Sequence, residues 1–308
     1  MNVIQKASTG LLFSGLIVAG FVSSCKKDRI QQDDYQDMES FYNDNKEQEQ
    51  EYTIDSLGNN CYVTCNKGTR ICTTAEMQEL PGNAPVYYTY TLKVVELYSA
   101  KDMILWRAPS VTGSGILETS AEIRVRLFKN GTQSELKNGR VYLMETANLP
   151  VTQSNMQPYF GYASGSNTNW NGSLSGVYPG FSDTVSHVNA TPAYYASEVG
   201  HTGFYSAARP APTSASTTSV TFTVAGTNTQ NIQLFLVFNN FKSIVKADNL
   251  VANHLPTGEP VTMIAFAKKQ DGNFYMDQQS LTISTGLQVP LNMTQTTEAG
   301  VLSALGAL

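Results

Sequence analysis

The alternation of apolar and polar positions predicts β-strands over most of the chain beyond residue 85. Residues 122–129 alternate with a period of two, which is the pattern of a strand with one buried face. That face would consist of Ile123, Val125 and Leu127. Asn130-Gly131 follows directly, and this dipeptide is the strongest short signal for a hairpin turn. A second turn pair, Asn138-Gly139, comes eight residues later, a spacing typical of antiparallel sandwiches.

A second group of strand patterns occupies residues 219–308. Residues 232–238 are almost entirely apolar and fit a central strand, and residues 260–268 carry apolar side chains on both faces. Asp271-Gly272 is a further hairpin turn. Other strands are expected at 219–225, 274–276, 280–284 and 287–292, with a short helix at 297–305. This order resembles that of small sandwich modules of the transthyretin or carboxypeptidase-regulatory type, a likeness of pattern that implies no function.

We therefore predict an all-β fold of two tandem antiparallel β-sandwiches, immunoglobulin-like or transthyretin-like, behind a disordered stalk. The first sandwich would span residues 86–218 and carry long loops rich in aromatic residues, Ser and Asn. The second would span residues 219–308 and end in the short helix. The alternative is one larger sandwich into which residues 146–218 are inserted.

The N-terminus has the parts of a secretory signal peptide, which we assign to residues 1–24. Lys6 precedes an apolar run at 11–22 that is too short to cross a bilayer as a helix. Val22-Ser23-Ser24-Cys25 resembles the lipobox of bacterial lipoproteins. The resemblance implies cleavage before Cys25 and attachment of acyl chains such as palmitate to that residue, which would anchor the protein in a membrane.

Residues 25–60 form an acidic segment that predicts a flexible tether. Residues 26–60 hold ten acidic and four basic side chains and few aliphatic ones, a composition that cannot bury a core. The charged run just after Cys25 looks like the surface-export signal of Bacteroidota lipoproteins. This implies an outer-membrane lipoprotein and favours the cell surface over the periplasmic face. Residues 61–308 hold fifteen acids and fifteen bases, so the neutral body argues against nucleic-acid binding.

Residues 61–85 form a lead-in that contains three cysteines. Cys61, Cys65 and Cys72 would travel through an oxidising compartment, so one disulfide and one remaining thiol are expected. The spacing leaves the pairing open. A zinc site would need a fourth ligand, and the histidines lie far away in sequence, so we predict no metal site and no cofactor.

Catalytic motifs are missing from the sequence. It contains no GxGxxG, GxxxxGK[ST], HExxH or GxSxG. A glycosidase needs two carboxylates about 5–10 Å apart. The candidates, most of them expected on the solvent faces of strands, are Glu96, Asp102, Glu118, Glu122, Glu145, Asp183 and Glu198. We therefore predict that the protein is not an enzyme.

Residues 146–218 are nearly free of charge and rich in aromatic rings, Ser and Asn. Aromatic rings beside amides suit sugars, and Tyr and Trp also anchor protein interfaces. The alternative is that these rings fill the core. The candidate binding aromatics are Tyr159, Tyr162, Trp170, Tyr178, Tyr194 and Tyr195. Trp170, flanked by Asn169 and Asn171, is the ring expected to be exposed.

Two short motifs match the O-glycosylation pattern of exported Bacteroidota proteins. They are Asp55-Ser56-Leu57 and Asp183-Thr184-Val185, so Ser56 and Thr184 are candidate sites.

These observations predict a lipid-anchored cell-envelope protein that acts as a non-catalytic binding or assembly component. Its partners would be the membrane, through the lipid, and an envelope protein or a glycan. The first alternative is a surface glycan-binding lipoprotein, and the second is a glycan-active hydrolase.

Overall fold

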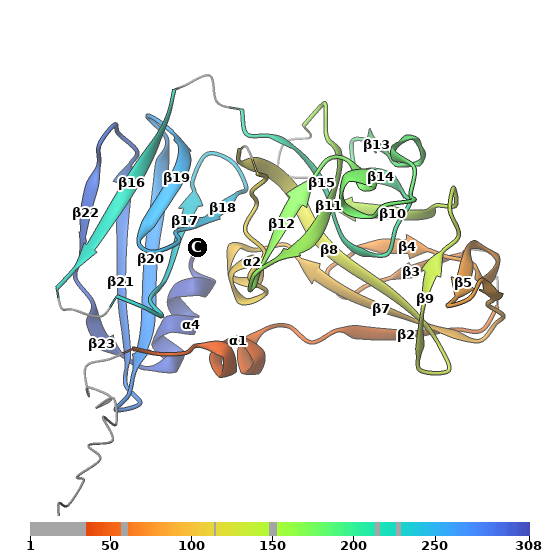
Figure 1. The fold of residues 1–308 in the computed structure, drawn as a ribbon, viewed down its shortest axis with the longest axis horizontal. Coiled ribbons are helices and arrows are strands. Elements are labelled where there is room, and N and C mark those ends of the chain that lie inside the picture. Colours follow the sequence, from red (N-terminus) through yellow and green to blue (C-terminus); the bar gives the residue numbers. More distant parts are fainter. Residues whose placement is uncertain (1–34, 57–60, 114, 148–152, 213–215, 226–228) are drawn as a thin grey trace, which may run out of the picture. The chain divides into compact units, whose positions relative to one another are not determined.

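The computed structural model describes residues 35–56, 61–113, 115–147, 153–212, 216–225 and 229–308 (Figure 1). Within these residues the strands form four sheets, in which nearly all pairings are antiparallel. The all-β fold predicted from the sequence is confirmed. The helices are short: α1 (Glu39–Asn45), α2 (Ala100–Leu105), α3 (Leu174–Val177) and α4 (Glu298–Gly306). Single 3-10 turns lie at Ala75–Met77 and Asp183–Val185.

A six-stranded sheet at the C-terminal end is apolar on both faces. Its strands, in spatial order, are β18 (Ile244–Lys246), β17 (Gln233–Phe238), β20 (Pro260–Lys269), β21 (Phe274–Thr282) and β23 (Thr294–Thr296). The short β1 (Tyr35–Gln36) pairs with the end of β20. Alternate residues of β17 and β20 are buried on opposite faces, so this sheet needs a cover on each side.

A three-stranded sheet covers one of these faces. It contains β19 (Val251–Pro256), β16 (Thr217–Val224) and β22 (Gln288–Leu291), and β16 runs parallel to β22. Leu234, Leu236 and Met263 of the larger sheet meet Phe222 and Val289 of the smaller one in a common core. This pair of sheets lies where the second sandwich was predicted.

Helices α1, α2 and α4 cover the other face (Figure 1). Phe41 of α1 packs on Phe266 of β20, with ring centroids 5.5 Å apart. Val301 of α4 and Met103 of α2 are fully buried in the same cluster. The C-terminal helix was predicted from the sequence, and the Thr297 side chain caps it by accepting a hydrogen bond from the Gly300 N–H.

The N-terminal half consists of two further sheets around one core. The nine-stranded sheet contains β12 (Asn167–Asn171), β11 (Gln157–Ser164), β15 (Gly203–Pro210), β8 (Leu117–Lys129), β9 (Thr132–Leu136), β5 (Gln78–Leu80), β6 (Ala84–Pro85), β7 (Tyr90–Leu97) and β2 (Gln50–Ile54). The five-stranded sheet contains β13 (His187–Ala190), β14 (Tyr194–Val199), β10 (Tyr142–Ala147), β4 (Arg70–Cys72) and β3 (Tyr62–Thr64). Ile123, Val125 and Leu127 of β8 point into this core, as their period of two predicts.

The turn dipeptides divide into hairpins and a crossover. Asn130-Gly131 and Asp271-Gly272 close the β8–β9 and β20–β21 hairpins, and each glycine has a positive φ. Asn138-Gly139 also forms a turn, but it takes the chain from β9 to β10 in the other sheet. The two strands expected at 274–276 and 280–284 are one strand, β21, because the whole length pairs with β20.

The structure corrects the expectation of a flexible tether for residues 35–56. This segment forms β1, α1 and β2, and β2 pairs with β7 along its full length. Four of its seven acidic side chains pair with bases of the body. The ion pairs are Glu39–Arg107, Glu47–Lys67, Glu49–Arg126 and Glu51–Lys93. The remaining tether residues, 25–34 and 57–60, lie outside the described residues.

The predicted division into two sandwiches matches two of the apolar cores, but a third core joins them. Val95 and Leu97 of β7 share one cluster with Phe235 and Ile264 of the C-terminal sheet. All the described residues accordingly belong to one compact unit. Strands β3 to β6 of the cysteine-containing lead-in belong to the sheets of the N-terminal half. No helix within the described residues combines the length and apolar composition needed to span a membrane.

Phe41→Ala tests whether the acidic segment belongs to the core. Phe41 is 3% exposed and contacts the rings of Phe266 and Phe274. We expect a loss of about 3–5 kcal/mol in the free energy of unfolding, because the change leaves a cavity in a packed aromatic cluster. Urea denaturation measures this loss.

The matched control for this substitution is Tyr87→Ala. Tyr87 is 68% exposed, so its loss should leave the free energy of unfolding within about 0.5 kcal/mol of the wild type. An equally small effect of Phe41→Ala would show that residues 35–56 are a tether after all.

Candidate functional site

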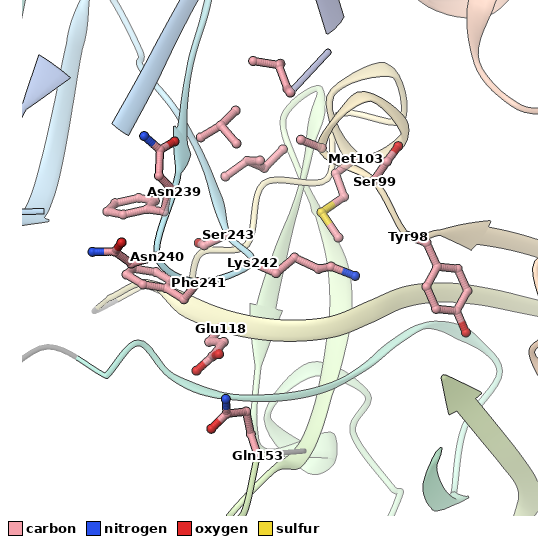
Figure 2. A pocket seen from close by; sticks show the side chains of 15 residues that line it. Tyr98, Ser99, Met103, Glu118, Gln153, Asn239, Asn240, Phe241, Lys242 and Ser243 are labelled. Carbon is pink, nitrogen blue, oxygen red and sulfur yellow. The ribbon is translucent and has the colours of Figure 1, made fainter. Parts of the chain in front are cut away.

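A hollow of about 560 Å³ opens where the loop between β17 and β18 meets α2 and β8 (Figure 2). Its size is within the usual range of ligand pockets. Its apolar lining comes from α2, β17, β18, the loop between these two strands and the residues after α4. These side chains are Met103, Val237, Phe238, Phe241, Ile244 and Leu308. The polar lining consists of Ser99, Glu118, Gln153, Asn239, Asn240, Lys242 and Ser243. A mixed lining of this kind suits a ligand with an apolar body and a few polar groups.

The β17–β18 loop is held in place by its own aromatic rings and by its neighbours. Phe238 and Phe241 stack with ring centroids 4.6 Å apart. The Phe238 N–H donates to the Ser243 carbonyl at 3.1 Å, which closes the loop. The exposed amides of Asn239 and Asn240 lie at its tip, at the rim of the hollow.

Backbone hydrogen bonds attach this loop to β8 and to the chain that precedes it. The Thr119 N–H donates to the Lys242 carbonyl at 3.0 Å, and the Ser110 N–H donates to the Ile244 carbonyl at 2.9 Å. The Lys242 ammonium donates to the Ser120 carbonyl at 2.7 Å. Lys242 therefore extends across the hollow at a fixed place, as Figure 2 shows.

Lys242 is a largely desolvated cation. Burial lowers the pKa of its ammonium to about 8, against the opposing attraction of Glu122 and Asp102. Among the described residues, no carboxylate forms an ion pair with it. The amine is therefore mostly charged at pH 7 and increasingly neutral above pH 8.

Glu122 on β8 is completely buried, and its carboxyl interacts electrostatically with Lys242. Its Oε1 accepts a hydrogen bond from the Ser110 hydroxyl at 3.1 Å, and its Oε2 has no hydrogen-bond partner. Burial raises the pKa of this carboxyl well above its usual range. Burial thus disfavours the charged forms of both Glu122 and Lys242.

The other acids around the hollow are already neutralised. Glu118 accepts hydrogen bonds from the Arg209 guanidinium at 2.7 Å. Asp102 pairs with Lys67 at 2.9 Å and caps α2 together with Ser99. The charged side chains in the lining of the hollow are thus Lys242 and the Arg209-paired Glu118.

The candidate catalytic acids are more deeply buried than the sequence suggested. Glu96, Glu118, Glu122 and Glu145 are buried rather than on solvent faces. Glu96 accepts hydrogen bonds from two backbone N–H groups, and Glu145 pairs with Arg70 at 2.6 Å. Of the seven candidates, only Glu118 is part of the lining of the hollow.

The structure corrects the expectation that Trp170 is exposed. Its ring is 1% exposed and packs edge-on against Phe204, and its indole N–H donates to the Pro109 carbonyl at 3.0 Å. A tryptophan with its N–H satisfied inside the protein packs as core. Tyr159 and Tyr162 line a second hollow beside Trp170, but Tyr159 is also buried.

The other three candidate aromatics are likewise structural. Tyr195 is fully buried in the N-terminal core and Tyr194 is half-buried. Tyr178 stacks on His201 at 3.7 Å and donates to the Gly161 carbonyl at 2.9 Å. Burial lowers the pKa of His201. Tyr162, Tyr178 and Tyr194 are half-buried, so three of the six candidate rings keep some exposure.

The cysteines and the proposed modification sites fall into three groups. Cys61 and Cys72 form a disulfide across the β3–β4 hairpin, and Cys65 is a buried thiol. Ser56 and Thr184 are both exposed. Cys25 lies outside the described residues. No cluster of potential metal ligands occurs in the described part of the chain.

Sequence reasoning missed the basic side chain of the hollow and its neighbour. Lys242 and Ser243 interrupt the mostly apolar stretch that runs from residue 232 to 245. A lysine within an otherwise mostly apolar stretch was the signal that the sequence offered. The burial of this lysine depends on β8 and α2, which are distant in sequence.

Comparisons with known proteins add no identification. No protein-family model matches the chain, and no curated protein matches it. The crystal structure of gamma-CGTase from alkalophilic Bacillus clarkii aligns with 8% identity over 78% of this chain and 41% of that chain, with a TM-score of 0.19. The chain thus spans less than half the length of that protein, and so low a TM-score carries no argument.

Glu122→Gln tests the protonation of the buried carboxyl. In the wild type, the folded state keeps a proton that the unfolded state loses above the usual glutamate pKa, so stability falls as pH rises from that value towards the raised pKa. The amide keeps the shape without titrating. We expect the stability of the variant relative to wild type to increase from pH 5 to 7, by up to about 1.4 kcal/mol per pH unit.

Urea denaturation across this pH range measures the difference. Glu76→Gln, at an exposed side chain, controls for the substitution itself. A relative stability of Glu122→Gln that is constant with pH would mean that Glu122 is ionised in the fold.

Proposed function

We propose that the protein is a lipid-anchored cell-envelope protein that acts as a non-catalytic binding component. The observation that carries this proposal is the hollow at the β17–β18 loop, with its apolar and polar lining and its largely desolvated Lys242. Such a site favours binding because it offers shape and charge to a ligand from fixed elements.

The alternatives have less support in the geometry. Glycan binding was inferred from six aromatic rings, and three of them, Tyr159, Trp170 and Tyr195, are buried. Glycoside hydrolysis needs two carboxylates facing one cleft. Glu118 lines the hollow already paired with Arg209, and Glu122 is completely buried and is not part of the lining.

The anchor rests on the lipobox-like sequence that ends at Cys25. The folded body begins by Tyr35, so nine residues separate it from the proposed lipid. Even fully extended, nine residues span at most about 32 Å. The anchor would therefore keep the body close to the membrane surface, within reach of an envelope partner.

Cys25→Ala tests the anchor. Without the acylated sulfur, the protein should move from the membrane fraction to the soluble fraction, because the acyl chains provide the hydrophobic attachment. Fractionation of native cells and the mass of the mature N-terminal peptide measure this. A Cys25→Ala protein that stays with the membrane would contradict the lipoprotein assignment.

A pull-down from the native envelope in mild detergent tests the binding role. We expect the wild type to bring down a stoichiometric envelope component. Ala100→Trp should lose it, because Ala100 lines the hollow and a large ring would fill the space. The control is Ala84→Trp, which places the same ring at an exposed position outside the hollow. Recovery of free monomer alone from the wild type would count against the proposal.

A further inference from the structure

The five-stranded sheet of the N-terminal half ends in β13, which lies at the margin of this sheet (Figure 1). One side of β13 pairs with β14 in antiparallel register, from His187 opposite Glu198 to Ala190 opposite Tyr195. Among the strands that the structure describes, none pairs with the other side of β13. A strand edge of this kind is a template on which a further strand can form.

The hydrogen bond that closes the β13–β14 hairpin shows which backbone groups point outward. The Thr191 N–H donates to the Tyr194 carbonyl at 2.9 Å, so these two residues form a hydrogen-bonded pair. Bonded and non-bonded pairs alternate along an antiparallel ladder. Val188 and Ala190 therefore occupy non-bonded pairs, and their N–H and C=O groups point away from β14. Within the described part of the chain, no hydrogen bond reaches these outward groups.

Other sheet edges of the fold carry the protection that such edges usually have. Residues 107–111 cover the edge of β12 through two backbone hydrogen bonds. Pro85, Pro256 and Pro290 lie in β6, β19 and β22, and a proline cannot donate to an added strand. Strand β13 contains no proline and no Asp, Glu, Lys or Arg, and three of its four residues are exposed. Its edge is therefore open to pairing.

The spacing of the outward groups makes this edge complementary to itself in charge. Val188 and Ala190 lie on either side of Asn189. When a second copy is placed antiparallel with the two Asn189 residues opposite each other, Val188 of each copy faces Ala190 of the other. Each N–H, with its partial positive charge, then meets a C=O with its partial negative charge. No carboxylate or ammonium on β13 opposes this approach.

We propose that β13 is a dimerisation edge, to which a second copy of this chain adds antiparallel across a two-fold axis at Asn189. The contact uses the same strand of both copies, as an interface across a two-fold axis requires. It joins the two five-stranded sheets into one continuous sheet. The hollow at the β17–β18 loop shares no lining residue with β13, so this inference does not depend on the proposed function.

Cysteine cross-linking of the purified full chain tests the position of the axis. Asn189→Cys places the two thiols in a non-bonded pair, whose Cα atoms lie about 4.5 Å apart, within the range of about 4.4–6.8 Å that a disulfide accepts. The native Cys65 is buried, and Cys61 and Cys72 are already joined. The measurement is the rate at which disulfide-linked dimer appears on a non-reducing gel after addition of a mild oxidant.

His187→Cys is the matched control for this cross-link. His187 is exposed on the same face of β13, but in the proposed register it lies opposite Thr191 of the second copy. The two thiols of the control are therefore about 14 Å apart. We expect Asn189→Cys to cross-link at least about ten-fold faster, because only its thiols are held together. Equal rates for the two variants would overturn the inference.

Sedimentation equilibrium of the full chain in mild detergent tests the pairing itself. The mass of the wild type should approach twice that of the monomer as the concentration rises. Ala190→Pro removes an outward N–H that the monomer does not use, and Asn189→Asp places like charges face to face with little change of shape. Both variants should remain monomeric and should unfold at the same urea concentration as the wild type.

Three results would contradict the proposed dimer. The first is a wild type that stays monomeric at all concentrations. The second is a dimer that persists in both Ala190→Pro and Asn189→Asp, because another surface would then join the copies. The third is a monomeric wild type whose envelope partner is lost in Ala190→Pro, which would assign the edge of β13 to that partner.

Discussion

The burial of both faces of the β17–β20 sheet is the constraint from which much of the remaining structure follows. A sheet that is apolar on one face needs one covering layer, but Phe235 and Phe266 add a second apolar face opposite Leu236 and Met263. The C-terminal part of the chain covers the first face with β16, β19 and β22. Its own helix α4 covers only part of the second, and α1 and α2 from the other end of the chain complete it. The two halves are thereby joined through one core.

The position of the hollow follows from this joining. Helix α2 must lie on the sheet to cover it, and β8 lies beside the β17–β18 loop, to which it is bonded through Thr119 and Lys242. Some of the polar atoms that this packing encloses have no hydrogen-bond partner, among them Glu122 Oε2 and the hydroxyls of Ser120 and Ser243. Desolvation shifts the buried acid and the buried amine towards their neutral forms, which lowers the cost of enclosing them. The residual charge of Lys242 is what makes the site different from an ordinary packing defect.

The sequence was most informative where local chemistry decides structure. Asn130-Gly131 and Asp271-Gly272 require a positive φ whatever surrounds them, and the alternation in β8 survives because only one of its faces meets the N-terminal core. The prediction of a tether for residues 35–56 was wrong because distant residues, and not local chemistry, decide the structure of this segment. Its composition is polar, but Phe41 and Tyr42 find their apolar surroundings some 190 residues away or more along the chain, beside Gln233 and Phe266. The composition of a segment does not show whether distant parts of the chain will bury its apolar side chains.

The same distinction explains why the sequence led us to expect an exposed Trp170. Aromatic rings among Asn and Ser look like a glycan surface in sequence, but Trp170 shows that a polar flank and a buried ring are compatible when neighbouring strands enclose the ring. Lys242 is the converse, a residue of ordinary type that becomes chemically distinctive because elements from three parts of the chain desolvate it. The pKa shift of Lys242 arises where tertiary packing removes water from a charge, and an amino-acid pattern alone does not reveal that place.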